Sequence, residues 1–139
     1  WAGAVSLLRA VGHVLDKVDG KASTEMADAI QAAWETLQRT KPEPDIFWQF
    51  IEEERNNVLK AYQFGAKENV NISPPTLHLD LKTGEQWSSG GAPTTYHHMM
   101  GPGLFAGQHP TDVVAEGIAW WRSYLDNIDA AAAQNDASA

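Results

Sequence analysis

Apolar residues recur at alternating spacings of four and three in two segments, one near each end of the chain. The repeat consists of Ala4, Leu8, Val11, Leu15 and Val18 in the first segment and of Val114, Ile118, Trp121, Leu125 and Ile128 in the last. Such spacing puts the side chains on one face of an α-helix and is typical of helices packed in a bundle. We therefore expect two helices that share a core.

Two more helices are predicted between these segments. Ser23 is a suitable N-cap for the first of them. Pro42 and Pro44 then break that helix, because proline lacks an amide donor and disfavours helical geometry in the residue before it. A further helix is expected over residues 46–64, with Gly65 as its C-terminal stop.

The pattern changes from a helical to a strand period within residues 66–108. Leu77, Leu79 and Leu81 alternate with polar residues, as in a strand with one buried face. The other expected elements are a hairpin turn at 82–85, a short strand at 96–99 and loops rich in glycine and proline at 88–93 and 101–107.

The expected fold class is mainly α, or α+β: a four-helix bundle with a small antiparallel β insert between helices 3 and 4. One domain is sufficient for 139 residues. It should span residues 1–129, with residues 66–108 as the β and loop insert. Residues 130–139 are rich in alanine and small polar residues and are expected to form a flexible tail.

Charge and composition limit the partners. The chain has 18 acidic and 10 basic residues and a net charge of -8, which repels nucleic acid unless a basic patch overrides it. No apolar run approaches the roughly 20 residues that span a bilayer. Without cysteine, disulfides and thiolate zinc sites are excluded. We expect an acidic, cytoplasmic homodimer without a cofactor, and the start at Trp1 leaves open whether an upstream segment was removed.

A charged pair interrupts the apolar face of the third helix. Glu54 and Arg55 lie between Ile51 and Val58, and helical spacing puts Arg55 on the same face as Tyr62. The guanidinium is either neutralised by Glu54 or another acid, or it opens onto a cleft. The second alternative makes Arg55 the leading candidate for a functional residue.

The segment from Glu52 to Tyr62 resembles the motif of HEPN domains (higher eukaryotes and prokaryotes nucleotide-binding). In the toxin branch of that family an Arg and a polar residue are followed by a His and a Tyr. Arg55, Asn56 and Tyr62 match, and Lys60 stands where the His should be. In active members the resemblance implies metal-independent RNA cleavage in a dimer cleft. A lysine, with an ordinary pKa of roughly 10.4, can hold a phosphate but is a poor proton shuttle.

Histidines offer two other possibilities. Arg9 and His13 lie one turn apart in the first helix, and we interpret them as surface residues. A metal site is suggested by His78, His97, His98 and His109, because imidazole is a common metal ligand. Adjacent residues of a strand point to opposite faces, however, so no metal ligand is assigned.

We therefore expect a non-catalytic helical interaction module that binds a partner chain or a phosphate-bearing ligand near Arg55. The other candidate ligand-binding residues are Glu54, Asn56, Lys60 and Tyr62. No catalytic residue is assigned. One alternative is a HEPN-like endoribonuclease or toxin in which Lys60 or His13 replaces the histidine, and another is a His-lined metal-binding protein.

Overall fold

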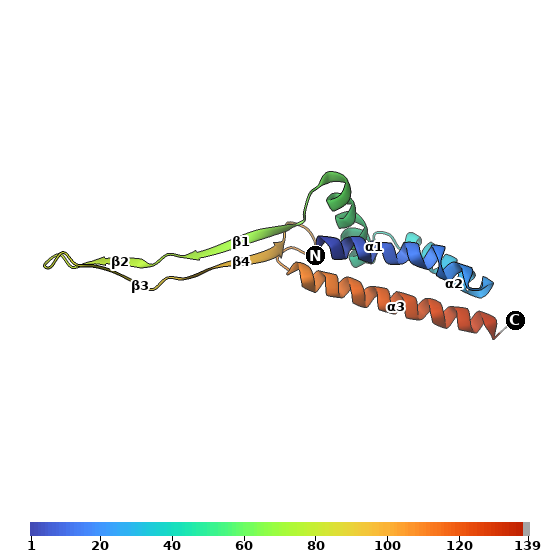
Figure 1. The fold of residues 1–139 in the computed structure, drawn as a ribbon. Helices are drawn as coiled ribbons and strands as arrows, with labels where there is room; N and C mark the ends of the chain where they lie inside the picture. Colours follow the sequence, from blue (N-terminus) through green and yellow to red (C-terminus); the bar gives the residue numbers. More distant parts are fainter. Residues whose placement is uncertain (138–139) are drawn as a thin grey trace.

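A helical body and a long β-ribbon arm make up this protein (Figure 1). The computed structural model describes residues 1–137, apart from the side chain of Pro93. The body consists of α1 (Ala2–Lys17), η1 (Asp19–Lys21), α2 (Thr24–Arg39), η2 (Ile46–Glu54), η3 (Asn57–Ala61) and α3 (Pro110–Asp136). The arm consists of β1 (Ala66–Ser73), β2 (Thr76–Leu79), β3 (Gln86–Ser89) and β4 (Ala92–Met100).

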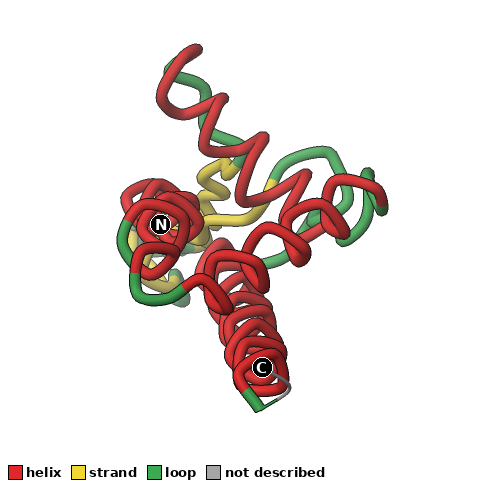
Figure 2. Tube along the Cα trace, turned by 90° about the vertical axis from the view of Figure 1, so that its right-hand side faces the viewer, coloured by secondary structure: helices red, strands yellow, loops and turns green. Residues whose placement is uncertain are grey.

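The predicted four-helix bundle is wrong, because the third helix does not continue as a regular α-helix. Its two halves, η2 and η3, are π-helical, and no residue of η3 is buried. The wider π turn, with hydrogen bonds from i to i+5, no longer keeps a 3.6-residue stripe on one face. In both views the end of η3 projects away from the rest of the body (Figures 1 and 2). The strands do lie between this helix and the last one, as expected.

The core of the body is built around η2. Phe47, Phe50 and Ile51 are almost completely buried and pack with residues of α1 and α3. The two long helices approach closely at Gly117, where an added Cβ would lie 3.0 Å from Cδ1 of Leu8. The sequence stripes of α1 and α3 are therefore confirmed as core-facing in their central parts.

Two positions of the predicted stripes differ from the structure, one just after the end of α1 and one within α3. Val18 and Ile118 are 61% and 41% exposed, whereas Val5 and Val113 are buried. The reason is that a straight helix rotates away from a strict seven-residue repeat, which moves the buried face by one position over a few turns. The predicted helix start at Ser23 is confirmed, with the Ser23 hydroxyl accepting from the N–H of Met26 at 3.1 Å, and α3 starts at Pro110.

The predicted flexible tail is wrong for residues 130–136, which continue α3. Ala132 is only 8% exposed and packs with Leu15, Ala29, Ile30 and Ile128 in a second apolar cluster at the far end of the body. The small alanine side chain permits close packing against α1 and α2, and alanine has the highest helix propensity. Residues 138 and 139 of the predicted tail lie outside the described residues.

The arm is a two-stranded antiparallel ribbon in two sections. At its base β1 pairs with β4, from Ala66 opposite Met100 to Ser73 opposite Ala92. At its tip β2 pairs with β3, and residues 82–85 lie in the connecting turn, as predicted. Gly90 and Gly91, both with positive φ, separate β3 from β4 within a segment that was expected to be a loop.

The predicted strand is confirmed at Leu77 and Leu79, whereas Leu81 lies in the turn after β2, and the predicted burial of these leucines is wrong. Leu77, Leu79 and Leu81 are 71%, 50% and 89% exposed, because the arm leaves the body and no other described element lies over its tip (Figure 1). A period of two identifies a face of a strand, but it does not reveal whether anything in the same chain covers that face. In Figure 2 the arm points away from the viewer, behind the helices.

Candidate anion-binding groove

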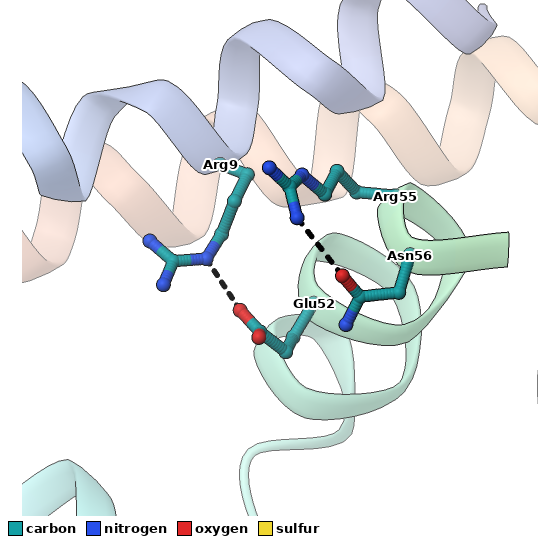
Figure 3. Close-up of polar contacts among 4 residues, drawn as sticks. All are labelled: Arg9, Glu52, Arg55 and Asn56. Carbon is teal, nitrogen blue, oxygen red and sulfur yellow. Dashed lines mark hydrogen bonds and ion pairs between the residues drawn. The ribbon is translucent and has the colours of Figure 1, made fainter. Parts of the chain in front are cut away.

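Arg55 lies at the junction of η2 and η3, where the helix faces α1. Its side chain is half-buried, and Nη1 donates a hydrogen bond to Oδ1 of Asn56 at 2.9 Å (Figure 3). Within residues 1–137 no carboxylate forms an ion pair with Arg55. The guanidinium therefore has donors that are not used by an acid of its own chain, since it carries five N–H groups.

Glu54 does not neutralise its neighbour. It is 7% exposed, and Oε1 accepts a hydrogen bond from the backbone N–H of Gly65 at 2.6 Å. This contact is possible because the helix ends at Tyr62, whose φ of 53° is left-handed, and the chain turns back. The predicted helix stop at Gly65 is thus corrected to Tyr62. Glu54 therefore joins the helical body to the root of the arm.

A second guanidinium lies beside the first. Arg9 of α1 forms an ion pair through Nε with Oε2 of Glu52, and both side chains are about one third exposed. Figure 3 shows the Arg9 and Arg55 side chains between α1 and the η2–η3 segment. Glu52 pairs with Arg9, and within residues 1–137 no ion pair joins it to Arg55.

The two arginines line an open groove of about 410 Å³ between α1 and η3. Its remaining walls are Ser6, Ala10, His13 and Leu59. The groove thus offers two guanidinium groups, an imidazole and a hydroxyl in a protein of net charge -8. Arginine is suited to carboxylate and phosphate because its planar fork can bind two oxygens at once. The chemistry of this groove is therefore that of an anion site.

A more enclosed cavity of about 320 Å³ lies on the other side of Arg9 and His13, which line both spaces. Its walls include the aromatic rings of Trp34, Phe47, Trp121 and Tyr124. Asp16 also lines this cavity, but Lys17 pairs with it at 2.7 Å and holds the pKa of its carboxyl below the usual value. The cavity can accommodate a planar apolar group.

The structure separates the residues that the motif places together. Asn56 orients Arg55, whereas Lys60 and Tyr62 are exposed and do not line the groove. The interpretation of His13 as a surface residue is confirmed, since His13 is exposed, but both His13 and the partly exposed Arg9 also line the groove. Their spacing of four on one helix face was the available signal, but nothing in the sequence indicates that this face meets Arg55.

The four histidines considered for a metal lie apart. His97 is opposite Asn69 in the ribbon and His98 is opposite Glu68, so they point to opposite faces. His78 stacks on Trp87 near the tip of the arm, and His109 caps α3. Among residues 1–137 no three His, Asp or Glu side chains are placed to hold a metal ion. The described part of the chain thus gives the metal alternative no site.

Comparisons with known proteins add no assignment. No protein family matches this chain, and neither a curated protein nor a solved structure is similar enough to count as a match. The resemblance to HEPN domains therefore stays a prediction. Within residues 1–137 no helix combines the length and the apolar character that crossing a bilayer requires.

Proposed function

We propose that this chain is a non-catalytic interaction module that binds an anionic group, a phosphate or a carboxylate, in the groove between Arg9 and Arg55. The observation that supports the proposal most is the half-buried Arg55 guanidinium, which faces this groove without a carboxylate partner in the described chain. A guanidinium that is partly removed from water without an acid is costly unless a ligand supplies the missing acceptor.

The neighbouring charges favour an anion that contacts both helices. Arg9 is balanced by Glu52, so Arg55 supplies the net positive charge of the groove. An external oxyanion can accept from Arg55 and from the remaining N–H groups of Arg9, since only Nε of Arg9 is hydrogen bonded to Glu52. Such charge-assisted hydrogen bonds are the strong ones in proteins.

The adjoining aromatic cavity extends the proposal to the rest of the ligand. Because Arg9 and His13 line both spaces, a ligand with its anionic group in the groove can direct a planar apolar part toward Trp34 and Trp121. We therefore expect an aromatic phosphate to bind more tightly than inorganic phosphate.

Isothermal titration with inorganic phosphate and with phenyl phosphate tests the proposal. Arg55→Ala should weaken phosphate binding about tenfold or more, since a hydrogen bond to a charged group contributes roughly 1.5–3 kcal/mol. Arg122→Ala is the matched control, because Arg122 is an exposed arginine of α3 outside the groove. Equal binding by the two variants, or no binding by the wild type, would overturn the proposal.

A second candidate function is metal-independent RNA cleavage, as the HEPN resemblance implies. The observation that favours it is that His13, an alternative to the missing histidine, lines the same groove as Arg55. Imidazole can exchange protons near neutral pH, which lysine cannot do readily. RNA cleavage is tested by incubating single-stranded RNA, in the presence of a chelator, with the wild type, Arg55→Ala or His13→Ala. RNA left intact by all three proteins eliminates the nuclease.

We also propose that the module is a cytoplasmic homodimer. The absence of cysteine is compatible with a reducing compartment. The net charge of -8 favours partners other than nucleic acid, because it repels a phosphate backbone. Light scattering of the purified protein tests the dimer, and a monomer at high concentration contradicts it.

A further inference from the structure

The base of the arm has two different faces. In an antiparallel ribbon, residues directly opposite each other point to the same side. Val70 lies opposite Tyr96, and Ala66 lies opposite Met100, so these four share one face with Ile72. The opposite face carries polar side chains, among them Asn69 opposite His97. The ribbon is therefore amphipathic, as if it belonged to a larger packed structure.

The apolar face begins in the core of the body and continues out of it, with one polar pair, Glu68 and His98, between Ala66 and Val70. Met100 is 9% exposed and belongs to the core cluster, and Ala66 packs against that cluster. Further along the arm, Val70, Ile72 and Tyr96 are 47%, 67% and 62% exposed. We call these three residues the arm face. No element of the described chain other than the ribbon itself lies over it (Figure 1).

A ribbon of this kind is poorly stabilised by its own contacts. An isolated two-stranded hairpin is marginally stable in water, because it has no second layer to bury its apolar side chains. Contiguous exposed apolar residues on one face are typical of sites that bind another protein. The arm face therefore lacks the second layer that its side-chain pattern requires.

We propose that the second layer is the arm face of another copy of this chain. Residues 66–100 contain two lysines and three acids, so most of the net charge of -8 lies on the helical body. Two bodies therefore repel each other more strongly than two arms, because two lysines and three acids leave each arm with a net charge of only -1. An interface that uses the same patch on both copies closes at a two-fold dimer. Two pleated faces can then pack about 10 Å apart, as in a β-sandwich.

The one acid on this side of the ribbon fits such an arrangement. Glu68 lies opposite His98, on the same side as Val70 and Tyr96. The two residues already lie opposite each other within one copy, so this pair brings no unpaired acid to an interface between two arms. This inference rests on the homodimer proposed above, whose interface it names, and it does not depend on the anion groove.

Sedimentation velocity over a wide range of protein concentrations tests the proposal with two adjacent residues. Tyr96→Lys places a charge on the arm face, and His97→Lys places one on the opposite face of the same strand. Both positions are exposed within one copy, so neither change should alter the helical circular dichroism of the body. We expect a wild-type dimer, a dimer for His97→Lys, and a dissociation constant raised about tenfold or more for Tyr96→Lys.

Two results would overturn the inference. A wild-type protein that remains monomeric at the highest concentration contradicts the homodimer and this interface together. Equal dissociation of the Tyr96→Lys and His97→Lys dimers shows that the interface lies elsewhere. Arg55→Ala separates this inference from the proposed anion binding, because it should weaken phosphate binding and leave the dimer intact.

Discussion

The carboxylate of Glu54 accepts a hydrogen bond from the backbone N–H of Gly65, 2.6 Å away, although eleven positions separate the two residues. This bond joins the end of η2 to the first residue before the arm. An added Cβ on Gly65 would lie 2.6 Å from the other carboxylate oxygen, so only glycine fits there without a shift of Glu54. The contact fixes the root of the arm and removes Glu54 from the vicinity of Arg55.

Glu54→Ala should therefore destabilise the protein by about 2 kcal/mol, because it leaves a partly buried N–H without its charged acceptor. Urea denaturation measures the change. Glu53→Ala is the control, since Glu53 is the exposed neighbour on the same helix and should change the free energy of unfolding by less than about 0.5 kcal/mol. Equal values for the two variants would contradict the structural role of Glu54.

Glu52→Gln should tighten phosphate binding. The substitution removes the carboxylate that pairs with Arg9 and so raises the positive charge of the groove. We expect a gain of about threefold to tenfold in affinity, decreasing as salt is added because the groove is open to solvent. Isothermal titration at low and high ionic strength measures it. Weaker binding by Glu52→Gln would mean that the ion pair is needed to orient Arg9.

Ala132→Asp should cost about 2–4 kcal/mol of stability, because it places a charge in the apolar cluster between α1, α2 and α3. Ala133→Asp, one position further along, changes an exposed residue and should have little effect. The melting temperatures of the two variants, measured by thermal unfolding, distinguish these effects. If both variants melt like the wild type, the end of α3 does not pack as described.

The turn at the tip of the arm should weaken in acid. The backbone N–H groups of Lys82 and Thr83 donate to Asp80 and lower the pKa of its carboxyl from the usual 3.8. Because the pKa of Asp80 is lower in the folded turn than in the unfolded chain, its carboxylate stabilises the turn fully above pH 3.8. This stabilisation is lost as the pH falls through the pKa of Asp80 in the folded turn.

Nuclear magnetic resonance can follow this transition through the Lys82 amide. Its chemical shift should titrate below pH 3.8 and stay constant above it. Asp80→Asn should show no such titration. A titration midpoint of the Lys82 amide shift above pH 3.8 would contradict the lowered pKa of Asp80.

The helices could be predicted in large part because their signals are local. Ser23 and Pro110 mark helix starts through their own chemistry, and the apolar repeat of α1 and α3 identifies Leu8 and Trp121 as core residues. The π geometry of η2 and η3 was not predictable, since the side chains of residues 46–61 suit an α-helix equally well. Neither was the projection of the arm, because its alternating pattern is that of a covered sheet.

The site could be predicted only in part. Arg55 was identified because a charge within an apolar stripe is a local anomaly. Its relation to Arg9 and His13 depends on how α1 packs against η2 and η3, which is a property of the tertiary structure. The motif grouped Lys60 and Tyr62 with Arg55 on the assumption of a continuous α-helix, and the helix ends at Tyr62 instead.

The availability of the Arg55 guanidinium to an external anion is measured most directly by nuclear magnetic resonance of the arginine side-chain Nε–H groups during a phosphate titration. We predict that the Arg55 signal shifts and saturates together with the backbone amides of Ser6 and Ala10 across the groove. The Arg122 signal, from outside the groove, should stay in place. An Arg55 signal that does not move, or that moves no more than that of Arg122, would contradict the account.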